Sequence, residues 1–96
     1  MLLAPLPERM RRFLLQTSIL DRLNGALCDA VTESGGCQEM LEQLRRENLF
    51  LMPLDDSREW FRFHRLFADF LQKELMRHYP VEVAPLHRRA ARWYLA

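Results

Sequence analysis

The chain has 96 residues, of which 49% are apolar, and its 14 basic residues nearly balance its 13 acidic ones, giving a formal net charge of +1. This length fits one small domain, and the balanced charge argues against a strongly basic nucleic-acid binder or a trap for acidic substrates. No apolar run approaches the ~20 residues of a membrane span, and the first residues lack the basic segment of an export signal. Two cysteines, Cys28 and Cys37, do not make a disulfide framework. We therefore expect a cytoplasmic protein with reduced thiols.

The first half of the chain predicts three helices. Residues 1–7 contain two prolines and are expected to be irregular. The first helix then begins at Glu8 and ends near Thr17, because Thr and Ser favour caps over helix interiors. A second helix follows, for which either Asp21 or Asn24 can act as the N-cap.

A turn and a third helix come next. The adjacent glycines Gly35 and Gly36 predict the turn, since glycine adopts backbone angles that other residues avoid. The third helix is predicted from Cys37 to about Glu47, and Asn48 ends it. Apolar residues recur at helical spacing along all three helices and are expected to form the core. These positions are Met10, Phe13, Leu14, Thr17, Leu23, Leu27, Cys28, Val31, Met40, Leu41 and Leu44.

The stretch from residue 49 to residue 71 organises the rest of the chain. Two short apolar runs, 49–54 and 60–63, flank a polar tip, which predicts a β-hairpin. The first run is apolar on both faces, so we expect it to be covered on both sides. Pro53 lacks an N–H and is expected at a sheet edge or beside the turn.

The second run of the hairpin alternates and then continues as a helix. Phe61 and Phe63 are predicted to face one side, with Trp60, Arg62 and His64 on the other. No Gly or Pro separates this strand from the fourth helix, so His64 marks the junction between them. We expect function to lie at this junction.

Two further helices complete the chain. The fourth is predicted to run to about His78 and to stop before Pro80. A fifth starts near Val83 or Pro85, and its apolar face consists of Leu86, Ala90, Trp93 and Tyr94. The sequence stops within this amphipathic pattern, so we expect a piece of a longer protein.

The order of elements predicts a mostly α fold. Three helices and a two-stranded β-hairpin wing are typical of a winged-helix domain, and two further helices follow. We assign residues 8–79 to the winged-helix domain and expect residues 82–96 to begin a further helical region. Its apolar stripe is larger than one small domain covers, so self-association through residues 83–96 is expected.

No catalytic or metal site is predicted. The three glycines at 25, 35 and 36 cannot form a phosphate-binding loop. The cysteines and histidines are too scattered for zinc, and both cysteines lie at apolar positions, which favours small core side chains over nucleophiles. The chain is therefore not expected to be an enzyme.

DNA binding is also disfavoured. The third helix of a winged helix often enters the major groove, which requires a basic outer face. Here that face carries Glu39, Glu42 and Glu47 against Arg45 and Arg46, and the hairpin tip is acidic as well.

Three segments resemble a known family: FLLQTSILDRLNGALCDAVT at 13–32, FRFHRLFADFL at 61–71 and PLHRRAARWY at 85–94. Over about residues 11–96 the chain resembles the large, ATP-dependent LuxR-type bacterial transcription activators related to the maltose-regulon activator, which are signal-transduction NTPases. The resemblance implies a winged-helix domain between a nucleotide-binding domain and a superhelix of tetratricopeptide-like repeats, which residues 82–96 would begin. It also implies that a separate LuxR-type helix-turn-helix reads the DNA.

The resemblance also implies a role for one residue. In this class of switches a winged-helix His reaches the β-phosphate of bound ADP and holds the resting state, and the matching position is His64. An imidazole beside a helix N-terminus suits a phosphate contact. Arg62 is a second, weaker candidate, for which a solvated charge is the better explanation. The alternative for His64 is an N-cap or a wing-packing residue.

The expected function is a non-catalytic regulatory module that couples the nucleotide-binding domain to the sensor superhelix. The chain itself would hold no cofactor, whereas the longer protein would bind ATP or ADP. The alternatives are a free-standing DNA-binding winged helix and a protein–protein interaction domain.

Overall fold

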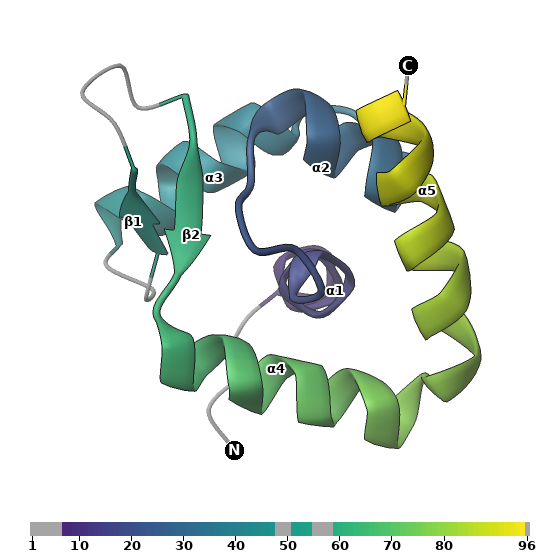
Figure 1. The fold of residues 1–96 in the computed structure, drawn as a ribbon. Coiled ribbons are helices and arrows are strands. Elements are labelled where there is room, and N and C mark those ends of the chain that lie inside the picture. Colours follow the sequence, from purple (N-terminus) through teal and green to yellow (C-terminus); the bar gives the residue numbers. More distant parts are fainter. Residues whose placement is uncertain (1–6, 48–50, 55–58, 96) are drawn as a thin grey trace.

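The computed structural model describes residues 7–47, 51–54 and 59–95, which form five α-helices and a two-stranded hairpin (Figure 1). The predicted mostly α winged helix followed by further helices is confirmed. In Figure 1 helix α1 is seen nearly end-on in the middle, with α2, α4, α5 and the hairpin arranged around it. None of the helices in the described part of the chain is long and apolar enough to cross a lipid bilayer.

Polar side chains that hydrogen-bond to the backbone mark the end of α1 (Glu8–Thr17) and the start of α2 (Gly25–Thr32). The Thr17 hydroxyl donates to the Phe13 carbonyl at 2.7 Å, as expected for the last turn of α1. The N–H of Leu27 donates to Asn24 Oδ1, also at 2.7 Å, so Asn24 is the cap of α2. Asp21, the other predicted cap, is exposed.

Helix α3 (Cys37–Arg46) follows a tight turn. Gly36 has φ +77°, the left-handed conformation for which glycine was expected there. The first N–H of α3 is satisfied by the Asp29 carboxylate, which accepts from Cys37 at 3.1 Å. The predicted terminator Asn48 lies outside the described residues.

The hairpin consists of β1 (Leu51–Pro53) and β2 (Phe61–Phe63) in antiparallel register. On its other edge β2 forms a bridge to Leu23, and the N–H of each of Leu23 and Phe61 donates to the other's carbonyl at 2.8 Å. The helical spacing predicts Leu23 on a helix stripe and does not reveal this bridge. Strand β2 is therefore central, and β1 is an edge strand.

The edge position explains Pro53. The N–H of Leu54 donates inward to the Trp60 carbonyl at 2.8 Å, so by alternation the nitrogen of Pro53 faces away from β2. A residue without an N–H costs the ladder nothing there and leaves no donor for an added strand. The predicted edge position of Pro53 is confirmed.

The prediction that the first strand is covered on both sides is wrong for the residues that the structure describes. Leu51 is buried, but Met52 and Leu54 are 39% and 42% exposed. The reason is that α3 packs on β1 from one side, and β1 lies at the sheet edge. Leu49, Phe50 and the tip residues 55–58 lie outside the described residues.

The last three elements are α4 (Arg65–His78), the short 3₁₀-helix η1 (Pro80–Glu82) and α5 (Val83–Leu95). Helix α4 packs against α1, and α5 packs against α2. Leu86 and Ala90 are buried, whereas Tyr94 is 54% exposed, because α2 covers only one side of α5. The predicted boundary between residues 79 and 82 stays a prediction.

The predicted helical stripes form one core. Met10, Phe13 and Leu14 of α1 pack with the apolar residues of α2, α3 and the hairpin. Phe61 and Phe63 point into this core while Arg62 and His64 are exposed, which confirms the predicted alternation within β2. Trp60, predicted on the same side as Arg62 and His64, is half-buried because it packs against Trp93.

Candidate functional site

The junction between β2 and α4 carries His64, the main candidate of the sequence analysis. His64 is the N-cap of α4, and its Nδ1 accepts a hydrogen bond from the N–H of Leu66 at 3.3 Å. The side chain is exposed. The structure thus confirms the N-cap alternative for His64, and it leaves the imidazole accessible from solvent.

The cap fixes which nitrogen of His64 can donate. Because Nδ1 accepts the backbone N–H, the proton of the neutral imidazole is on Nε2. A hydrogen-bond donor is therefore available on the side of the ring away from the helix. A phosphate oxygen is an acceptor, so a capping His64 can still donate to one.

Two arginines flank His64. Arg62 on β2 and Arg65 at the start of α4 are both exposed and line one pocket, together with Asp21 and Asp69, and His64 is not among its lining residues. Arg62 thus lies near the junction, as predicted. Arg65 is not among the residues predicted for the site, and its place directly after His64 is the one signal in the sequence that points to it.

The outer face of α3 is slightly acidic, as predicted. Glu39, Glu42, Arg46 and Glu47 are exposed and Arg45 is half-buried. Phosphate contact requires a basic face, and this one is slightly acidic.

The two cysteines are free thiols inside the core. Burial raises the pKa of Cys28, and burial also raises the pKa of Cys37 to about 11. A thiolate is the reactive form, so neither is suited to act as a nucleophile. Within residues 7–47, 51–54 and 59–95, no three His, Cys, Asp or Glu side chains gather as metal ligands would.

Aromatic side chains join the hairpin to α5. The rings of Trp60 and Trp93 meet edge to face with centroids 6.2 Å apart, and Tyr94 contacts Trp93 at 5.2 Å. The Arg22 guanidinium lies 4.9 Å from the Trp60 ring centroid. These contacts place the end of α5 next to Trp60, at the end of β2 nearer the hairpin tip.

Comparison with known proteins identifies relatives of the chain. The HTH-type transcriptional regulator MalT of Klebsiella pneumoniae subsp. pneumoniae is 43% identical over 88 residues, which are 92% of this chain and 10% of that protein. MalT of Vibrio campbellii is 42% identical over 86 residues, which are 90% of this chain and 10% of that protein. The serine/threonine-protein kinase PknK of Mycobacterium tuberculosis is 42% identical over 89 residues, which are 93% of this chain and 8% of that protein.

The chain therefore spans about a tenth of the length of the curated relatives it matches. A family model described as the MalT winged helix domain matches residues 1–83, which include α1 to α4 and both strands. The match covers most of the chain and agrees with its fold, so the chain belongs to the MalT winged helix domain family.

Proposed function

We propose that this domain is a non-catalytic regulatory module of a bacterial LuxR-type, ATP-dependent transcriptional activator, in which it couples a nucleotide-binding domain to a sensor superhelix. The observation that carries the proposal is the exposed His64 at the N-terminus of α4, whose Nδ1 makes the cap so that Nε2 is the nitrogen that can donate. The names of the relatives support a regulatory role. The same domain is found in proteins named transcriptional regulator and in one named protein kinase, which favours a task common to both over DNA reading.

The proposed contact joins His64 to the β-phosphate of ADP bound by the neighbouring domain. Nε2 would donate to a phosphate oxygen, and the positive end of the α4 dipole would favour the anion. Arg62 is a weaker candidate than His64 for a direct contact, because the pocket that it lines also carries the carboxylates of Asp21 and Asp69. This chain would bind no nucleotide alone, because ATP or ADP would be cradled by the other domain.

Helix α4 offers a physical link between the proposed contact and the C-terminal side. It runs without interruption over 14 residues from the His64 cap, about 21 Å at 1.5 Å per residue, and η1 then leads directly into α5. A movement of the nucleotide-binding domain that pulls on His64 would displace α4 and, through it, α5. The proposed partners are accordingly the nucleotide-binding and helical repeat domains of the same chain, in the cytoplasm.

The test uses three substitutions of His64 in the longer protein. His64→Ala removes both the cap and the imidazole, whereas His64→Asn and His64→Asp replace the imidazole by good helix caps. Loss of a charge-assisted hydrogen bond worth about 1.5–3 kcal/mol should speed ADP release about tenfold to hundredfold in all three. Asp should be the fastest because it also repels the phosphate, and the variants should activate transcription with less inducer.

Lys73→Gln provides a control, since it removes an exposed charge from the middle of the same helix. It should leave ADP release unchanged. If His64 acts only as a cap, His64→Ala alone will lower the melting temperature and none of the variants will alter ADP release. Unaltered release in a well-folded His64→Asp protein would refute the proposed phosphate contact.

A further inference from the structure

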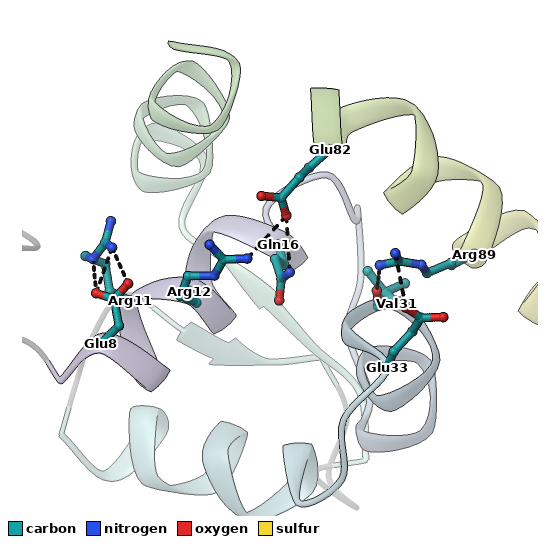
Figure 2. A network of polar contacts seen from close by, with 8 residues as sticks. All are labelled: Glu8, Arg11, Arg12, Gln16, Val31, Glu33, Glu82 and Arg89. Carbon is teal, nitrogen blue, oxygen red and sulfur yellow. Dashed lines mark hydrogen bonds and ion pairs between the residues drawn. The ribbon is translucent and has the colours of Figure 1, made fainter. Parts of the chain in front are cut away.

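An arginine of α5 holds the end of α2. Arg89 Nη1 donates to the Val31 carbonyl at 2.8 Å, and Arg89 Nη2 lies 3.1 Å from Glu33 Oε1. Figure 2 shows the guanidinium reaching from α5 to both groups. The Val31 carbonyl is one of the last four of α2, which have no partner within the helix. Arg89 therefore supplies, from α5, a hydrogen-bond donor for a carbonyl at the C-terminus of α2.

Glu33 is an unusual residue for its position. It directly follows α2 with φ 55°, and it is the only residue other than glycine with positive φ in the described part of the chain. Glycine is the usual choice there, because a side chain makes the left-handed conformation costly. A carboxylate at a helix C-terminus is also repelled by the helix dipole. Pairing with Arg89 offsets part of these costs, since the Glu33 side chain is 67% exposed and ion pairs of this kind are weak.

Apolar packing also holds helix α5, because Val83 and Trp93 are partly buried against the core. Only Leu86 and Ala90 of α5 are buried. Just before it, Glu82 accepts from Gln16 at 3.3 Å and lies 3.5 Å from Arg12, which ties η1 to α1 (Figure 2). Arg89 therefore adds a polar attachment at the end of α2 to the apolar packing between α5 and α2.

We propose that Arg89 is a positioning residue that makes the docking of α5 and the closing turn of α2 mutually dependent. When α5 leaves α2, Glu33 keeps its strained backbone and its unfavourable charge but loses its partner, and the last turn of α2 loosens. The same turn leads into α3, and Arg9 of α1 contacts it through the Gly35 carbonyl at 3.5 Å. A change at α5 therefore reaches the segment that positions α3. This inference does not depend on nucleotide binding.

The experiment measures amide hydrogen exchange of the 96-residue chain, separately for residues 29–34 and for α5. Arg89→Gln removes a charged donor, and we expect exchange at the end of α2 to rise about threefold to tenfold. Glu33→Gln removes a partly exposed ion pair and should have a smaller effect. Because both substitutions break one unit, the double variant should exchange no faster than Arg89→Gln alone.

Two further variants sharpen the test. Glu33→Gly suits the left-handed backbone and removes the acid, so in this background Arg89→Gln should loosen α2 less. Arg92→Gln removes a positive charge from an exposed site on α5. It should leave the hydrogen exchange of residues 29–34 and of α5 unchanged. The proposal would be overturned if Arg89→Gln loosened α5 while the end of α2 kept its protection. Additive effects of the Arg89 and Glu33 substitutions would overturn it as well.

Discussion

Asn24, Asp29 and His64 show three ways in which this domain satisfies the start of a helix. Asn24 caps its own helix, Asp29 reaches the first N–H of α3 from the preceding helix, and His64 caps α4 through a ring nitrogen. The first cap could be predicted to within two candidates, because Asn and Asp are both good caps. The second could not, since it depends on how α2 and α3 lie together.

The buried thiols give a prediction about alkaline stability. Burial raises the pKa of Cys28 and raises the pKa of Cys37 to about 11, whereas thiols in an unfolded chain ionise near pH 8.5. The unfolded chain therefore loses these protons first, so the full stability is present below about pH 8.5 and falls as the pH rises toward 11. Denaturant midpoints at pH 7 to 10.5 should show this fall.

The matched variants are Cys28→Ala and Cys37→Ala. Each removes one titrating thiol, so the loss of stability between neutral and alkaline pH should be smaller than in the unchanged chain. Each variant should reduce the fall in midpoint by a similar amount, because up to pH 10.5 both thiols stay protonated in the folded chain. An identical pH dependence in all three proteins would show that the thiols do not contribute to it.

At the scale of elements, α5 is the least covered helix in the described part of the chain. Its last turn carries Tyr94, 54% exposed, and Leu95, 86% exposed, next to the half-buried Trp93. Apolar side chains gathered on one exposed face favour association. We therefore expect the chain to self-associate at millimolar concentration through residues 83–96.

The corresponding test is light scattering on a Tyr94→Ser, Leu95→Ser double variant. It should remain monomeric at concentrations where the unchanged chain associates. Val81→Ser is the control, because Val81 is 84% exposed but lies on η1, outside the predicted surface. A strictly monomeric unchanged chain at millimolar concentration would contradict the prediction.

The hairpin shows that an element's neighbours decide how its side chains are used. Strand β1 is apolar throughout and β2 alternates, yet β2 is the central strand, because it pairs with β1 on one edge and with Leu23 on the other. Strand β1 lies at the sheet edge and exposes Met52. A three-residue strand does not contain enough sequence to reveal whether its outer face is covered.

At the scale of the whole molecule, charge argues against DNA binding. The net charge is +1, and the exposed face of α3 carries more carboxylates than guanidinium groups. Binding to generic duplex depends on releasing counterions from many phosphate contacts. We expect no shift of a labelled duplex at micromolar protein and moderate salt.

A charge-reversed variant shows that the assay can detect such binding. The outer face of α3 becomes basic when Glu39→Lys, Glu42→Lys and Glu47→Lys are combined. This triple variant should bind duplex DNA at low salt, and its binding should weaken as the salt concentration is raised. A salt-dependent shift by the unchanged chain would instead favour a DNA-binding winged helix.

The sequence by itself determined the order of the helices, the hairpin, the buried alternation of β2 and the place of His64 at the start of α4. These features depend on residue spacing, caps and prolines, whose effects act over a few neighbouring residues. Only the tertiary structure decided that Leu23 pairs with Phe61 and that Arg89 bonds Val31, 58 residues away in sequence. Those contacts depend on how complete elements pack against each other. An apolar stripe or an arginine in the sequence does not reveal which element it will contact, because the partner is distant in the chain.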